Sequence, residues 1–172
     1  MYGKEEALFF MRNKGKPIAT FAEVEAFTGL KFSTLANWVA RDVIPINPER
    51  PGKGLPVRFL ASDCCKLYIA GKLHMYGFRP HATVRLACGI YHHVSDYNRE
   101  LAGMVHDCFG NVIAMPEKRY VSSWCNAKSG EFYGTRAAGY LPFMDGAVQV
   151  GFDLVEISEA VNEFVKKQSN GG

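Results

Sequence analysis

Two short segments with helical periodicity, joined by a turn at Gly29, constrain the fold of this chain more than any other feature. The first segment begins at Thr20, and Glu23 three residues later completes the pair of side chains that forms a capping box. Gly29 suits the left-handed backbone of a tight turn, and a second helix is expected from about Phe32 to Arg41. The two helices form a helix-turn-helix pattern. Their core-facing side chains are expected to be Phe21, Val24, Phe27, Leu35, Trp38 and Val39.

A basic, turn-rich segment follows the second helix. Gly52 and Gly54 favour a tight turn, whereas Pro51 and Pro56 limit strand pairing, so we expect a short hairpin. The cations of this hairpin are Arg50, Lys53 and Arg58.

The rest of the chain predicts two more helices, a group of strands and a final helix. Ser62 or Asp63 should cap a helix that ends near Tyr76, and Pro80 suits the first turn of the next one. Strands are predicted at 111–115, 120–125, 131–135 and 147–152, with a turn at 128–130. Asp153 should cap the final helix. The buried stripe of that helix is expected to be Leu154, Ile157, Val161 and Phe164.

These elements predict an α+β fold in two domains. The 172 residues suffice for one medium domain or two small ones, and the 48% hydrophobic content can form a core. We expect an N-terminal winged helix-turn-helix over residues 1–93 and a small α+β domain over 94–172. Residues 1–85 hold 13 Lys and Arg against 7 Asp and Glu, whereas residues 86–172 hold 7 against 10. This asymmetry suggests that the first half contacts a polyanion, with chance scatter of charge as the alternative.

Residues 20–76 resemble the MerR-type family of winged helix-turn-helix DNA-binding domains. The matching stretches, in family order and spacing, are Glu23-Val24, Thr28-Gly29-Leu30, Thr34-Leu35-Ala36-Asn37-Trp38, Val43-Ile44-Pro45, Gly52-Lys53-Gly54 and Arg58-Phe59 before Asp63. The resemblance implies a recognition helix in the major groove and a wing along the DNA backbone. The chain differs from the family at Ala36 and Asn37, where an arginine and an aromatic residue are usual, and at Asp42, where a glycine is usual.

The candidate DNA contacts fall into two groups. Asn and Arg side chains can bond two edge atoms of one base, and cations on a wing can reach phosphates. The candidates for base contact are Ser33, Thr34, Asn37 and Arg41, and those for phosphate contact are Arg50, Lys53 and Arg58. A solvated helix face and a solvated turn are the alternatives. Trp38 shares its stripe with Leu35 and is expected to lie in the core rather than stack on a base.

A second cluster, Cys88, His92, His93, His106 and Cys108, has spacings compatible with zinc ligands on a helix face and a strand face. However, the chain has no Cys-x-x-Cys pair, and free cysteines are often buried as small apolar side chains. We therefore predict no metal site and no cofactor. The chain also lacks a P-loop, a Rossmann fingerprint and a nucleophile elbow, so no enzymatic activity is predicted.

The expected function is that of a sequence-specific transcriptional regulator of bacterial or phage type that binds double-stranded DNA. The chain has no run of about 18 apolar residues, so no membrane span is predicted. The odd number of cysteines and the adjacent pair Cys64-Cys65 fit a reducing cytoplasm. Two alternatives stay open: an architectural DNA-binding protein of phage packaging or excisionase type, and a metal or small-molecule sensor with secondary DNA binding.

The second half is rich in aromatic residues, which are enriched at protein interfaces. They are Phe109, Tyr120, Trp124, Phe132, Tyr133, Tyr140, Phe143 and Phe152. We expect this half to join two copies of the chain into a homodimer that binds a two-fold DNA site. Packing of the same rings against the first half of their own chain and a ligand pocket are the alternatives.

Overall fold

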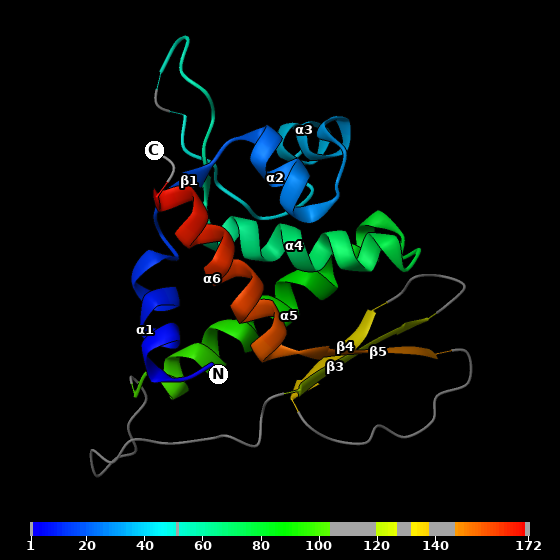
Figure 1. Cartoon of the computed structure of the whole chain (residues 1–172). Helices are drawn as coiled ribbons and strands as arrows, with labels where there is room; N and C mark the ends of the chain where they lie inside the picture. Colours follow the sequence, from blue (N-terminus) through cyan, green and yellow to red (C-terminus); the bar gives the residue numbers. More distant parts are fainter. Residues whose placement is uncertain (1, 51, 104–119, 127–131, 138–146, 171–172) are drawn as a thin grey trace.

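The computed structural model of the chain describes residues 2–50, 52–103, 120–126, 132–137 and 147–170, and this part has an α+β architecture (Figure 1). The helices are α1 (Lys4–Asn13), α2 (Phe21–Thr28), α3 (Phe32–Ala40), α4 (Ala61–Met75), α5 (Pro80–Leu101) and α6 (Leu154–Asn170). The strands are β1 (Pro17–Ala19), β2 (Phe59–Leu60), β3 (Tyr120–Asn126), β4 (Phe132–Ala137) and β5 (Ala147–Asp153). None of these helices combines the length and apolar character that crossing a membrane requires.

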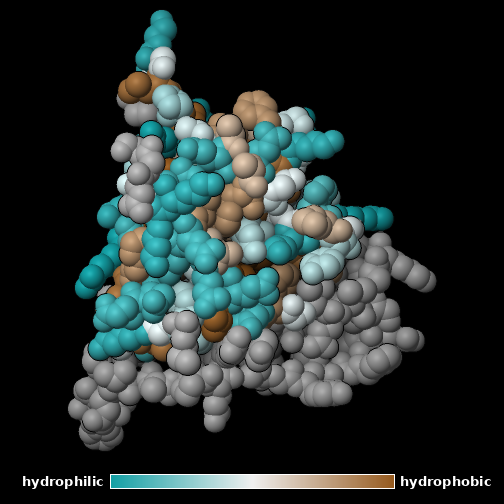
Figure 2. Space-filling view, in the orientation of Figure 1, coloured by the Kyte–Doolittle hydropathy of each residue, from teal (hydrophilic) through white to brown (hydrophobic). Residues whose placement is uncertain are grey.

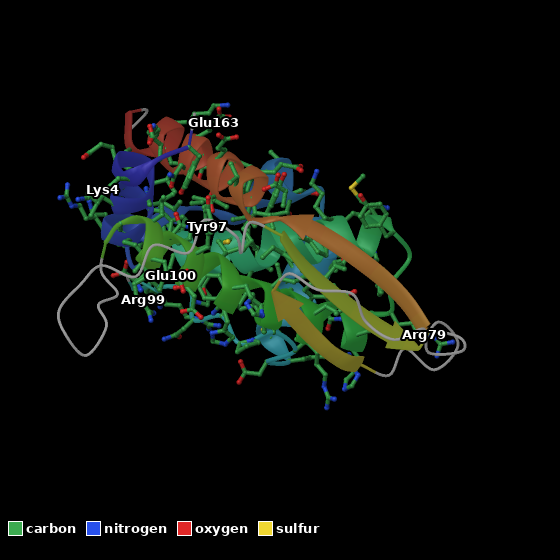
Figure 3. All side chains as sticks on the ribbon, turned by 90° about the horizontal axis from the view of Figure 1, so that it is seen from below. Lys4, Arg79, Tyr97, Arg99, Glu100 and Glu163 are labelled. Atoms are coloured by element: carbon green, nitrogen blue, oxygen red, sulfur yellow. The ribbon has the colours of Figure 1, made fainter. Side chains whose placement is uncertain are left out.

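Helices α4 and α5 form the centre of the molecule. α4 packs against α2, α5 and α6, and α5 also packs against α1, β3 and β4. Helices α2 and α3 lie at one end of the molecule, and the antiparallel sheet β4-β3-β5 lies at the other (Figure 1). Seen from below, this sheet lies nearer the end of α5 marked by Arg79 than the end marked by Arg99 (Figure 3). The central helices therefore separate the two ends.

The helix boundaries follow from local side-chain chemistry. The Thr20 amide donates to Glu23 Oε2 at 2.7 Å, which is the glutamate half of the predicted capping box. Gly29 ends α2 with φ 72°, so the predicted left-handed turn is confirmed. The Val155 amide donates to Asp153 Oδ1 at 2.8 Å, as predicted for the start of α6. The predicted cap of α4 at Ser62 or Asp63 was wrong, because this helix begins at Ala61 after the N-cap Leu60, whereas its end at Met75, next to Tyr76, agrees with the prediction.

The three later strands agree closely with those predicted from the sequence. β5 pairs with β3 in continuous antiparallel register, from Tyr120 opposite Asp153 to Asn126 opposite Ala147. β5 then leads directly into α6. The predicted strand at 111–115 and the predicted turn at 128–130 lie outside the described residues. The pairing of β1 with β2 was not predicted, and it ties a segment near the N-terminus to the end of the basic segment.

The division expected at residues 93 and 94 differs from the structure. This position lies inside α5, which continues to Leu101. The predicted stripe of α6 is buried, with Leu154 and Val161 at most 1% exposed, and it belongs to the same apolar core as α2, α4 and α5. Thus the helices on both sides of the expected boundary share one core.

Buried polar side chains also connect α6 to α5 and α1. Asn98 of α5 donates to Ser158 Oγ of α6 at 2.8 Å. Asn162 of α6 donates to the backbone carbonyl of Glu6 in α1 at 2.8 Å. Asn98 and Ser158 are fully buried, and a buried polar group without such a partner costs about 1–3 kcal/mol. These bonds therefore fix the position of α6 as well as satisfying its polar groups.

Candidate nucleic-acid interface

Helix α3 has one buried and one exposed face. Leu35 is fully buried and Trp38 is 3% exposed, so the prediction that Trp38 belongs to the core is confirmed. Ser33, Asn37 and Arg41 are exposed and follow one another at four-residue intervals. Residues at this spacing lie on the same helix face. The four residues predicted to contact bases therefore all lie in α3 or at its C-cap. The fourth of them, Thr34, is half-buried.

The chain leaves α3 through a left-handed residue. Asp42 has φ 52°, a conformation that glycine adopts most easily and that Asp tolerates better than most residues. The Val43 amide then donates to the Trp38 carbonyl at 3.0 Å. Asp42 therefore occupies a position whose backbone favours glycine, the residue type that the MerR-type pattern has there.

The basic segment forms the short hairpin that was predicted, here called the 49–58 hairpin. Glu49 and Arg58 exchange two backbone hydrogen bonds, of 2.7 and 2.9 Å, and form an isolated antiparallel bridge. Gly52 and Gly54 turn the chain with φ 131° and 89°. The hairpin projects from the body of the molecule at the same end as α3 (Figure 1). The space-filling view shows it as a narrow projection with a largely hydrophilic tip (Figure 2).

The cations of this end are available for an external anion. Arg50, Lys53 and Arg58 of the hairpin, and Arg41 after α3, are exposed. Within the described residues, their side chains take part in no ion pair or hydrogen bond. A cation that has no internal partner keeps its full charge for a phosphate.

The base of the hairpin is fixed to α4 by a charged pair. Lys66 donates to the Pro45 carbonyl at 2.7 Å, and its ammonium lies 3.6 Å from Asp63 Oδ1 and 5.2 Å from the centre of the Tyr91 ring. Asp63 accepts a hydrogen bond of 3.3 Å from the Asn47 amide. Burial raises the pKa of Asp63, and the Lys66 ammonium opposes this shift. The pair thus holds the segment between α3 and the hairpin, a role that could not be assigned from the sequence.

Two exposed cations near this end were missed by the sequence analysis. Lys31 precedes the first turn of α3 as its N-cap, and Lys16 lies in the turn before β1. The residues on either side of Lys16 line one groove with Pro48 and Arg50. Lys16 is distant from the hairpin in sequence, so only the β1–β2 pairing reveals that the two are neighbours.

The described residues contain no group of three potential metal ligands. Cys88 is half-buried, and burial raises the pKa of its thiol, which opposes the thiolate form that a metal requires. His106 and Cys108, the other members of the cluster considered from the sequence, lie outside the described residues.

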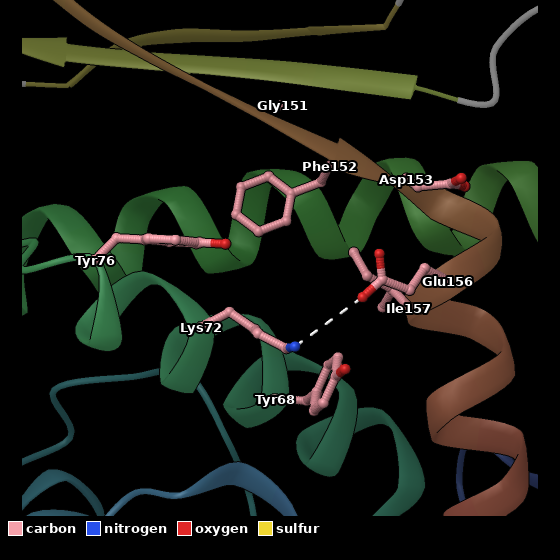
Figure 4. Close-up of a pocket in the computed structure, with 8 residues that line it drawn as sticks. All are labelled: Tyr68, Lys72, Tyr76, Gly151, Phe152, Asp153, Glu156 and Ile157. Atoms are coloured by element: carbon pink, nitrogen blue, oxygen red, sulfur yellow. Dashed lines mark ion pairs between the residues drawn. The ribbon is translucent and has the colours of Figure 1, made fainter.

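A pocket lies between α4, β5 and the start of α6 (Figure 4). Its volume is about 80 Å³, well below the several hundred Å³ of a typical small-molecule site. Lys72 and Glu156 form an ion pair of 4.0 Å beside it. Phe152, which lines the pocket, is 9% exposed and packs in the common core. Phe152 therefore packs within its own chain, which was one of the alternatives for the aromatic residues of the second half.

Comparison with models of known protein families found no match to the chain, and comparison with curated proteins found no match either.

Proposed function

We propose that the chain binds double-stranded DNA through a winged helix-turn-helix in which α2 and α3 form the helix pair and the 49–58 hairpin is the wing. One observation supports this most strongly: the exposed polar face of α3 and the exposed cations of the hairpin lie at the same end of the molecule. A helix with this polar face can enter the major groove, while a projecting basic hairpin reaches the neighbouring phosphates. We assign the chain to sequence-specific transcriptional regulators of bacterial or phage type, acting in the cytoplasm as a homodimer.

The proposal divides the candidate residues by role. Asn37 and Arg41 extend from the exposed face of α3 and its C-cap, where bidentate contacts to bases are available. Lys53 and Arg58 extend from the hairpin and contact phosphates, with Arg50 beside them. Ser33 and Thr34 contribute hydroxyl groups in the first turn of α3.

Replacing Lys53 and Arg58 together by glutamine should weaken binding to preferred and random duplexes alike. Each lost phosphate contact is expected to reduce the slope of log affinity against log salt concentration by about 0.9. The slope is measured by fluorescence anisotropy between about 50 and 200 mM salt, where phosphate contacts dominate affinity. The matched control replaces Lys4 and Arg99, which lie away from the hairpin (Figures 1 and 3). An equal effect of the control pair, or a loss restricted to the preferred duplex, would reject the phosphate role.

Replacing Asn37 or Arg41 by alanine should cost about 1–3 kcal/mol of binding free energy on the preferred duplex and less on random duplexes. The preferred duplex is obtained by selection from a random library with the unaltered chain. Because both side chains are exposed, thermal unfolding of the variants should match that of the unaltered chain. Equal losses on both kinds of duplex would instead assign these residues to the DNA backbone.

Footprinting on genomic DNA then separates regulation from an architectural role. A regulator protects a discrete site near a promoter, whereas a packaging protein of the same fold protects a terminal genome site. The absence of any duplex binding at low salt would refute both.

A further inference from the structure

Phe32 is a large apolar residue of α3 that is exposed. This residue is the first of the helix, and 53% of it is exposed, although burying a phenylalanine ring contributes about 1.5–3 kcal/mol. Its sequence neighbours Lys31 and Ser33 are also exposed, so the first turn of the helix presents one apolar ring and two polar residues.

The ring of Phe32 is held in place from within. It contacts the Phe21 ring in an edge geometry, with centroids 5.2 Å apart and planes at 64°. Phe21 in turn contacts the fully buried Phe59 ring at 4.8 Å and 88°. Phe59 belongs to β2, the strand that follows the 49–58 hairpin. This row of three rings therefore connects the first turn of α3 to the base of the hairpin and limits the positions that Phe32 can adopt.

We propose that Phe32 contacts the 5-methyl group of a thymine in the major groove and so selects thymine at one position of the DNA site. The inference depends on the proposed function. The N-terminal residues of a recognition helix are among those that contact base edges. The 5-methyl group of thymine is the apolar group that bases present in the major groove. Apolar side chains such as Phe contact it. A fixed, exposed ring at this end of α3 matches that group chemically.

Replacing thymine by deoxyuridine, one position at a time in the selected duplex, tests the inference. The substitution removes only the methyl group and leaves every hydrogen-bonding edge intact. At one position, uracil should weaken binding of the unaltered chain about fourfold, the effect of exposing one methyl group. Phe32→Ala should bind the thymine duplex about as weakly and should no longer distinguish thymine from uracil. Such non-additivity identifies a direct contact.

Two controls make the result specific. Met75→Ala removes an apolar side chain that is 76% exposed at the end of α4, and it should keep the full sensitivity to uracil. The salt slope of Phe32→Ala should equal that of the unaltered chain, because no phosphate contact is lost. If the chain binds the duplex but no position shows a difference between thymine and uracil that depends on Phe32, the inference is refuted while DNA binding stands. If no duplex is bound at all, the proposed function itself fails.

Discussion

Phe164→Ala should lower the free energy of unfolding of the whole chain by about 3–5 kcal/mol, the usual cost of truncating a buried phenylalanine. Phe164 of α6 lies parallel to Phe27 of α2, with centroids 4.1 Å apart and an interplanar angle of 6°. Phe27 also stacks on Tyr68 of α4 at 4.9 Å and 17°. Removing the Phe164 ring takes away a stacked contact between α6 and α2, one of the proposed DNA-binding helices, and leaves Phe27 stacked on Tyr68.

Urea denaturation followed by circular dichroism measures this loss as a lower midpoint at an unchanged slope. Glu159→Ala provides the control, since Glu159 is an exposed residue of the same helix and its replacement should change stability by less than about 0.5 kcal/mol. Equal midpoints for the two variants would mean that α6 does not stabilise α2. The single core described above would then be wrong, and the two-domain division expected from the sequence would be restored.

The features that were predictable from the sequence depend on residues close together in the chain. The capping residues Thr20 and Asp153, the left-handed turn at Gly29 and the apolar stripes of α3 and α6 all follow from spacings of a few residues. For the same reason, the exposure of Asn37 and Arg41 could be foreseen, because the periodicity that buries Leu35 and Trp38 leaves them on another face.

The features that were not predictable depend on contacts between distant segments. An amphipathic stripe indicates that α6 buries one face, but it does not identify the element that covers that face. For this reason, the sequence did not reveal that α6 shares one core with α2 and α4. The β1–β2 pairing involves strands of three and two residues, too short to give a periodic signal. Asp63 has the residue type of a helix cap, yet it accepts a bond from Asn47 and pairs with Lys66, and both roles arise from tertiary contacts.

Gly71→Ala should also be strongly destabilising, although alanine is intrinsically better than glycine inside a helix by about 1 kcal/mol. Gly71 is buried in α4, where a Cβ atom would lie 2.2 Å from the carbonyl oxygen of Thr28 and 3.2 Å from its carbonyl carbon. These are backbone atoms at the end of α2, so the overlap cannot be relieved by turning a side chain. α2 must move away from α4, and overpacking of this kind costs about 3 kcal/mol at the upper end of its usual range.

Displacement of α2 should reach the proposed DNA-binding surface, because α3 follows α2 after a three-residue turn and packs against it. We therefore expect Gly71→Ala to lower the thermal midpoint and to weaken duplex binding even at temperatures where the chain stays folded. Gly15→Ala is the matched control: no atom lies within 4 Å of its added Cβ, so its effect on either measurement should be small. A Gly71→Ala chain as stable as the unaltered one, or more stable, would show that α2 and α4 are not in close backbone contact. The packing of α2 against α4, which positions α3 through α2, would then be wrong as described.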